Sequence, residues 1–93
     1  MMDYYIIAYD VRDDKRRAKI YKTLKEYAAS VQYSVFEGYI AREDLIKLKY
    51  RLKRQMHEKE DSICFYSLCV GCRGQIGRLG MEIMVFGKDD III

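Results

Sequence analysis

Apolar residues follow one another along three stretches of the chain in the way that β-strands require. Residues 3–11 read DYYIIAYDV, which is aromatic and branched almost throughout, as in a central strand covered on both faces. Residues 62–70 read SICFYSLCV and have the same character. Residues 31–40 read VQYSVFEGYI, which fits either one bent strand or a tight hairpin turning near Tyr33 and Ser34.

Two further stretches have the spacing of amphipathic helices. Residues 14–28 follow Asp13 or Asp14 as a helix cap, and residues 43–57 form the clearer of the two helices. The apolar face of the first helix consists of Ile20, Tyr21, Leu24, Tyr27 and Ala28. The apolar face of the second consists of Leu45, Leu48, Leu52 and Met56.

The C-terminal part of the chain predicts one more strand. Four glycines spaced through residues 71–80 indicate a flexible connection, and residues 81–86 (MEIMVF) form the strand. The chain closes on three isoleucines at residues 91–93, and we expect this apolar end to add to a sheet edge or to a partner.

This order of elements predicts an α+β protein with the ferredoxin-like βαββαβ arrangement and an extra C-terminal strand. We expect a single domain over residues 1–93, with its core at about residues 3–70. Right-handed crossovers over the two helices should place the first and fourth strands side by side at the centre of an antiparallel sheet. One face of such a sheet carries no helices, and packing two such faces together would give a homodimer with identical residues in facing pairs.

Composition and charge narrow the class of protein. Three cysteines, an odd number, argue against a disulfide framework and predict a reducing, cytoplasmic setting. No apolar segment approaches the roughly 20 residues that a membrane span needs, so we expect no membrane partner. The net charge is only +3, but residues 12–25 and 42–59 carry seven basic residues each, which suits a polyanionic partner. The chain has no Walker phosphate loop, nucleophile elbow or HExxH motif, which sets most enzyme classes aside.

The cysteine spacing offers a separate metal hypothesis. Cys64, Cys69 and Cys72 have the C-x₄-C-x₂-C spacing that begins a plant-type iron–sulfur site. The fourth cysteine is missing, so we expect free thiols, with a four-thiolate site built by two copies as the alternative.

Asp10 is the candidate for metal chemistry. It ends an apolar strand, where its carboxylate either opens the turn before the first helix or binds Mg²⁺ or Mn²⁺. Asp13 and Asp14 are second choices as ligands, because a helix N-terminus already favours an aspartate. Arg17 begins the apolar face of the first helix, where a guanidinium requires a carboxylate or a phosphate, or extends to the rim.

Other residues could contact nucleic acid. Tyr33 and Phe36 could stack on bases or fill the core. Basic residues surround the corner at Asp10 and could follow a phosphate backbone, or could simply be solvated. They are Arg12, Lys15, Arg16, Lys19 and Lys22, with Lys47, Arg51 and Arg54 on the second helix.

Three motifs together resemble the CRISPR-associated Cas2 family. The first strand ends in YDV at residues 9–11, the helix begins with DDKRR at residues 13–17, and VQYSVFEG follows at residues 31–38. The similarity runs from about residue 4 to residue 68, and the specific part is QYSVFE coupled to the strand-end aspartate.

The resemblance implies a homodimer in which Asp10 and its twofold mate face each other and bind Mg²⁺ or Mn²⁺. It implies a metal-dependent endonuclease on single-stranded RNA or double-stranded DNA, with Asp10 catalytic, and a role in spacer acquisition in which the dimer bridges Cas1 integrase subunits. It also implies a hairpin within residues 31–40 and a C-terminal strand docked on the partner subunit. The implied nucleic-acid-binding residues are Arg12, Arg16, Arg17, Lys19, Ser34 and Phe36.

One departure from the family affects the choice between functions. Many members have a glycine and an arginine before VQ, where this chain has Ala28, Ala29 and Ser30. The departure weakens the expectation of nuclease activity more than that of a scaffold role. The alternatives are a non-catalytic DNA-binding adaptor and a small RNA-binding regulator.

Overall fold

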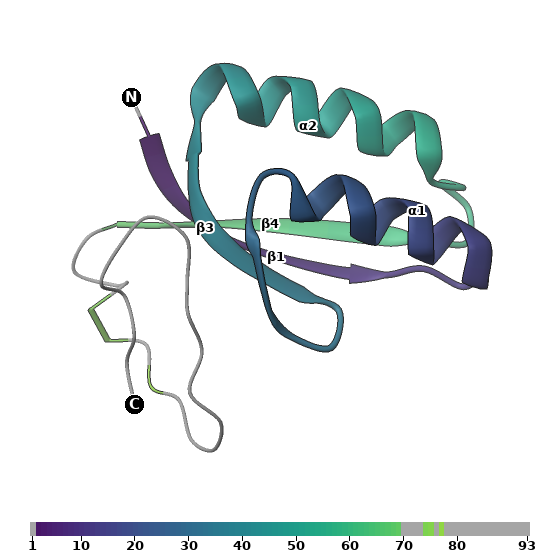
Figure 1. The fold of residues 1–93 in the computed structure, drawn as a ribbon, viewed down its shortest axis with the longest axis horizontal. Coiled ribbons are helices and arrows are strands. Elements are labelled where there is room, and N and C mark those ends of the chain that lie inside the picture. The colour runs from purple at the N-terminus through teal and green to yellow at the C-terminus, as the bar shows by residue number, and fades with distance from the viewer. Residues whose placement is uncertain (1, 70–73, 76, 78–93) are drawn as a thin grey trace.

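Six elements follow one another in the predicted order in a computed structural model, which describes residues 2–69, 74, 75 and 77. They are β1 (Met2–Asp10), α1 (Asp14–Lys25), β2 (Ala29–Gln32), β3 (Val35–Ala41), α2 (Arg42–Gln55) and β4 (Ser62–Leu68). The strands form one antiparallel sheet, and both helices lie on the same face of it (Figure 1). The α+β class is therefore confirmed, whereas the strand expected at residues 81–86 and the apolar end at 91–93 lie outside the described residues.

The centre of the sheet differs from the prediction. β1 does pair with β4, with Asp10 opposite Ser62, but it also pairs along its other edge with β3, where Ala8 lies opposite Val35. The strand order is β2-β3-β1-β4, so β1 and β3 are central and β4 has one neighbour among the described residues. The prediction of a central fourth strand is wrong because the hairpin strand β3 occupies the inner edge of β1 and leaves β4 only the outer one.

A tight hairpin joins β2 to β3, which decides between the two readings of residues 31–40. Ser34 has a φ of 64°, in the left-handed region that a tight turn requires. The pairing of β2 with β3 shifts by one residue between Ser30 and Gln32, as in a β-bulge. The Ser34 carbonyl accepts a hydrogen bond of 3.0 Å from the backbone N–H of Tyr9, so the turn is held against the end of β1.

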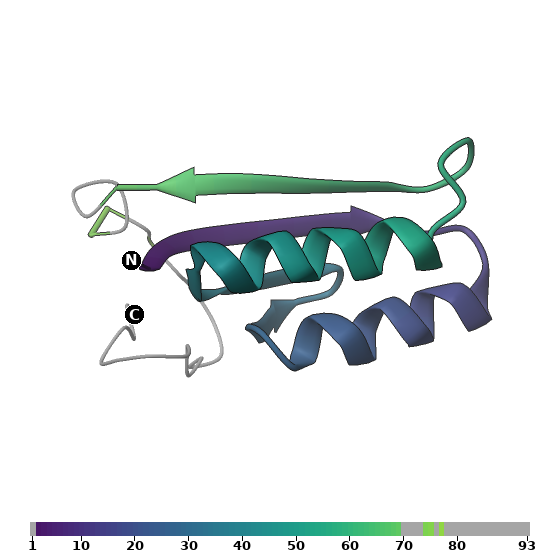
Figure 2. The same ribbon diagram turned by 90° about the horizontal axis from the view of Figure 1, so that it is seen from above.

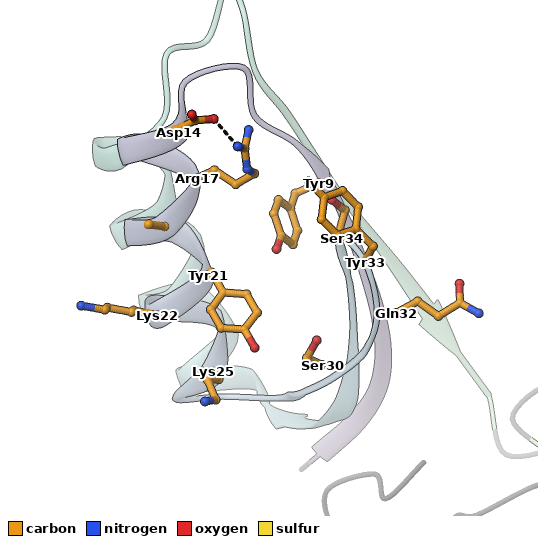
Figure 3. A pocket seen from close by; sticks show the side chains of 11 residues that line it. Tyr9, Asp14, Arg17, Tyr21, Lys22, Lys25, Ser30, Gln32, Tyr33 and Ser34 are labelled. Atoms are coloured by element: carbon orange, nitrogen blue, oxygen red, sulfur yellow. Dashed lines mark hydrogen bonds and ion pairs between the residues drawn. The ribbon is translucent and has the colours of Figure 1, made fainter. Parts of the chain in front are cut away.

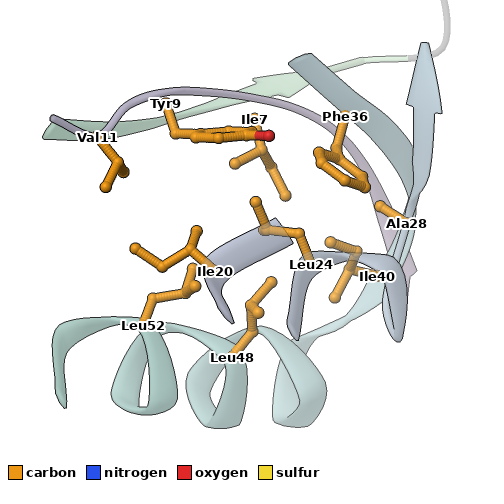
Figure 4. Close-up of a cluster of buried hydrophobic side chains, with 10 residues drawn as sticks. All are labelled: Ile7, Tyr9, Val11, Ile20, Leu24, Ala28, Phe36, Ile40, Leu48 and Leu52. Carbon is orange, nitrogen blue, oxygen red and sulfur yellow. The ribbon is translucent and has the colours of Figure 1, made fainter. Parts of the chain in front are cut away.

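The helix-facing side of the sheet and the two helices enclose one apolar core (Figure 4). Its largest fully buried side chains are Phe36, Ile7, Ile20, Leu24, Leu48 and Leu52. Both helices therefore bury the apolar faces predicted for them, while Tyr21 lies at the margin of the core, 36% exposed. The two helices lie side by side over the sheet (Figure 2).

The helix ends differ slightly from the expected ones. α1 ends at Lys25 because the backbone N–H groups of Tyr27 and Ala28 both donate to the Leu24 carbonyl, each at 3.0 Å, and close the last turn. This turn carries Ala28 into the core. No helix among the described residues is long and apolar enough to cross a membrane.

Truncation of the α2 face should test this core. Leu48 has no exposed surface, so Leu48→Ala should lower the free energy of unfolding by about 2–5 kcal/mol through lost burial and a residual cavity. Ile46→Ala on the same helix removes a side chain that is 64% exposed, and it should change stability by no more than about 0.5 kcal/mol. Urea unfolding of the two variants measures the difference, and equal losses would contradict the packing of α2.

Candidate functional site at the end of strand β1

Asp10 is the last residue of β1, and its side chain is exposed. Because successive side chains of a strand point to opposite faces, Asp10 lies on the same face as Tyr4 and Ala8, away from the helices. Within the part of the chain that the structure describes, its carboxylate accepts no hydrogen bond and forms no ion pair. It is therefore available to a ligand.

The two aspartates that follow have local partners. Asp13 is the N-cap of α1, and its carboxylate accepts a hydrogen bond of 2.9 Å from the backbone N–H of Arg16. Asp14 forms an ion pair with Arg17, three residues further along the helix. Capping therefore accounts for Asp13, as expected, and the turn does not need Asp10.

Arg17 is tied back to the residue after Asp10. Its Nη1 donates a hydrogen bond of 2.8 Å to the Val11 carbonyl, while its Nη2 pairs with Asp14. The hydrogen bond that the guanidinium donates to the Asp14 carboxylate raises the pKa of Arg17. The sequence predicts a carboxylate or phosphate partner for Arg17, and Asp14 supplies the carboxylate. The Arg17 side chain remains 32% exposed.

The sequence gives no sign of the buried carboxylate of Asp61, which lies in the loop between α2 and β4. Its side chain has no exposed surface and accepts hydrogen bonds from the Arg16 guanidinium at 2.8 and 3.1 Å. It also accepts from the backbone N–H of Arg12 at 3.1 Å and that of His57 at 2.9 Å. The hydrogen bonds from these donors hold the pKa of Asp61 far below its ordinary value, and the bond from the Arg16 guanidinium has the largest effect.

The predicted basic residues therefore divide into two groups. Arg16 is held by Asp61 and, at 3.2 Å, by Glu60, and these bonds raise its pKa. Arg12 and Lys19 have exposed side chains. Binding of nucleic acid by any of these residues stays a prediction. In the described structure, Arg12 and Lys19 form no ion pair with a carboxylate, whereas Arg16 does.

The two predicted residues of the hairpin lie in different environments. Ser34 is half-buried at the turn beside Tyr9. Phe36 has no exposed surface and packs against Tyr9 and Tyr21, with ring centroids 6.0 and 5.3 Å away. The expectation that Phe36 contacts nucleic acid is corrected, because alternation along β3 turns its ring into the core. It can shape the site only through its neighbours.

A single chain supplies few metal ligands at this site. Among the described residues, no group of three or more histidines, cysteines or acidic residues is placed so that it could hold a metal ion. Mg²⁺ commonly binds through one or two carboxylates and keeps several water molecules, so Asp10 fits such an ion if a second copy supplies the other carboxylate. Cys64 and Cys69 are exposed, and Cys72 lies outside the described residues, so the iron–sulfur hypothesis stays untested.

Neutralising Asp61 should destabilise the protein. Asp61→Asn should lower the free energy of unfolding by about 2 kcal/mol at neutral pH, because the amide leaves some of its donors without an acceptor. The folded pKa of Asp61 lies below the unfolded one, so the carboxylate stabilises the fold fully above about pH 4 and loses this effect as the pH falls further. Urea unfolding from about pH 2 to pH 7 should show a difference from the wild type that shrinks on acidification.

Glu58 provides the control for this prediction. It lies exposed in the same loop, and Glu58→Gln should change stability by less than about 0.5 kcal/mol at every pH. A stability difference between Asp61→Asn and the wild type that stays constant on acidification would show that the ionised carboxylate is not what stabilises the loop.

Comparison with known proteins places the chain in a family. The family model described as CRISPR associated protein Cas2 matches residues 2–76. A CRISPR-associated endoribonuclease Cas2 of Thermus thermophilus is 40% identical over 79 residues, covering 85% of this chain and 84% of that protein. The crystal structure of a hypothetical protein from Thermus thermophilus superposes with a TM-score of 0.81 at 34% identity, covering 91% of this chain and 99% of that one.

A second solved structure contains a relative inside an assembly. One chain of a partial Cas6-RT-Cas1–Cas2 complex superposes with a TM-score of 0.71 at 30% identity, covering 83% of this chain and 84% of that one. These matches agree with the motifs at residues 9–17 and 31–38. The chain belongs to the Cas2 family of CRISPR-associated proteins.

Proposed function

We propose that this chain is a metal-dependent endonuclease on single-stranded RNA that works as a homodimer, with Asp10 of both copies at one shared site. The observation that carries the proposal is the exposed Asp10 carboxylate, which has no partner in the described structure, whereas Asp13, Asp14 and Asp61 each have one. The name endoribonuclease, given to the Thermus thermophilus relative, supports RNA as the substrate.

The helix-free face of the sheet suits the proposed dimer. Its strand order and its two helices on one face support a ferredoxin-like arrangement, in which the other face would pair with a second copy. On that face, β1 and β4 place Ala8 beside Cys64 and Ile6 beside Tyr66, which is 53% exposed. Asp10 ends the same row, so a twofold axis near it would bring two carboxylates together.

Asp10 and its twofold mate would hold the Mg²⁺ ion. When bound, the ion would lower the pKa of a coordinated water molecule and offset the charge of the phosphodiester. The exposed Arg12, two residues further on, adds positive charge where the phosphate must approach. Asp61 fixes the backbone of Arg12 and so orients this corner of the site. We place this activity in the cytoplasm, where cysteines such as Cys64 stay reduced.

A second candidate function is that of an adaptor that holds duplex DNA and joins Cas1 subunits. The relative found in a complex with Cas1 supports it. So do Lys15, Lys19 and Lys22, which are exposed and lie on one face of α1 at helical spacing. This face could follow a phosphate backbone whether or not Asp10 supports hydrolysis.

Removing the Asp10 carboxylate tests the nuclease proposal. Asp10→Ala should reduce Mg²⁺-dependent cleavage of labelled single-stranded RNA by about 100-fold or more, since a metal site contributes several kcal/mol to the transition state. Cleavage is measured with Mg²⁺ and with EDTA, on RNA and on duplex DNA, after light scattering has shown that each protein is a dimer.

Asp3→Ala is the matched control, because it removes an exposed carboxylate from the other end of the same strand. It should leave cleavage unchanged. Equal cleavage by Asp10→Ala and the wild type would contradict the proposal, and a wild-type dimer that cuts neither substrate would leave the adaptor function.

The salt dependence of duplex binding tests the adaptor function. Replacing Lys15, Lys19 and Lys22 with glutamine should weaken DNA binding and reduce the slope of log K against log salt concentration by up to about 3. These lysines form no ion pair in the described structure, so the change should leave stability nearly intact. Fluorescence anisotropy of a labelled duplex over a range of salt concentrations gives the slope.

An equal loss of charge elsewhere controls for net charge. Glutamine at Lys49, Lys53 and Lys59 removes three positive charges from α2 and the following loop. If both triple variants change the slope equally, the α1 face is not the DNA-binding surface.

A further inference from the structure

A cavity of about 640 Å³ opens between α1 and the β2–β3 hairpin (Figure 3). It lies on the helix-bearing side of the hairpin edge of the sheet, whereas Asp10 lies on the helix-free face. Its volume falls in the range of sites that hold a small organic ligand. The cavity is therefore a candidate binding site separate from the proposed metal position.

Three tyrosines surround the cavity. Tyr9 lies on β1 between α1 and the hairpin, Tyr21 projects into the cavity from α1, and Tyr33 stands at the tip of the hairpin (Figure 3). Burial raises the pKa of the Tyr9 phenol, and the neighbouring Tyr21 and Tyr33 phenols raise it further. Because all three tyrosines line the same cavity, a single ligand in it can contact more than one of the rings.

The rings differ in how firmly they are held. Phe36 packs edge-on against Tyr21 and contacts Tyr9 at a tilt, so both rings are packed against the core. Tyr33 is 87% exposed at a turn fixed by the bond from Tyr9 to Ser34. Two packed rings and one exposed ring in the same cavity offer the aromatic surfaces on which a flat aromatic ligand stacks.

The polar groups of the cavity add a preference for anions. Arg17 and Lys25 lie at its rim, and the Lys25 Nζ is 5.7 Å from the centroid of the Tyr21 ring. Asp14 offsets the charge of Arg17, which leaves the charges of Lys25 and of Lys22, another lining residue. The hydroxyls of Ser30 and Ser34 supply hydrogen-bonding groups on the hairpin side. A flat aromatic group attached to an anion satisfies all of these features, and a nucleotide is such a group.

We infer that this cavity binds one unpaired nucleobase of a nucleic-acid strand, stacked on Tyr21 and Tyr33, with a backbone phosphate near Lys25. The inference deepens the proposed function and rests on its claim that the chain binds nucleic acid. A free nucleotide shares this chemistry, and the experiment separates the two.

The test compares strands with and without bases. The probes are a fluorescein-labelled oligoadenylate of about ten nucleotides and an oligomer of the same length and charge with abasic residues, both in EDTA so that neither is cut. The wild type should bind the strand with bases about 5- to 150-fold more tightly, as stacking of one base provides. Tyr33→Ala and Tyr21→Ala should remove this preference and leave binding of the abasic strand unchanged, while Tyr33→Phe should retain it.

Tyr50→Ala is the control, since it removes a tyrosine that is 62% exposed on α2, away from the cavity. Equal affinity of the wild type for both strands, or a preference that survives Tyr33→Ala, would overturn the inference and leave the proposed function standing. Binding of neither strand in EDTA would also overturn the inference, whereas the proposed function would still be decided by the Mg²⁺ cleavage assay. Tyr33-dependent binding of adenosine monophosphate without a base preference in the strand would overturn the strand assignment in favour of a free nucleotide.

Discussion

The site depends on the hydrogen bonds that the buried carboxylate of Asp61 accepts. It joins three segments that are distant in sequence: the loop after Asp10, through the backbone of Arg12; helix α1, through Arg16; and the end of α2, through His57. A carboxylate without exposed surface would be costly in this position if it were not surrounded by donors. Charge-assisted hydrogen bonds offset that cost and make the position of the loop specific.

The other side of the same corner is held by backbone geometry. The left-handed conformation of Ser34 lets its carbonyl reach the N–H of Tyr9, and Arg17 holds the Val11 carbonyl. The residues before and after Asp10 are therefore both fixed, while the carboxylate itself remains exposed. This rigid support of a free functional group is what a binding or catalytic position requires.

Much of the fold could be predicted from the sequence, because it depends on local patterns. The apolar run of β1 and the helical spacing of Leu48 and Leu52 each locate an element within a few residues. The strand order could not be read as well, because it depends on which edge of β1 the hairpin occupies. The burial of Phe36 depends in the same way on the turn at Ser34, because the turn sets the side of the sheet that each following residue faces.

Only part of the candidate site could be predicted from the sequence. Asp10 and the cap at Asp13 stand out, because both positions follow rules for strand ends and helix starts. The pairing of Arg16 with Asp61 joins residues 45 positions apart and leaves no spacing to recognise. The cavity beside Tyr33 also depends on the packing of α1 against the hairpin, which is a tertiary property.

The binding of Mn²⁺, followed by electron paramagnetic resonance, tests the central claim most directly, because it reads the proposed site without requiring activity. The account predicts one ion for every two chains, lost in Asp10→Asn and retained in Asp3→Asn. One tightly bound ion per chain, or binding that Asp10→Asn leaves unchanged, would contradict a metal site shared by two Asp10 carboxylates.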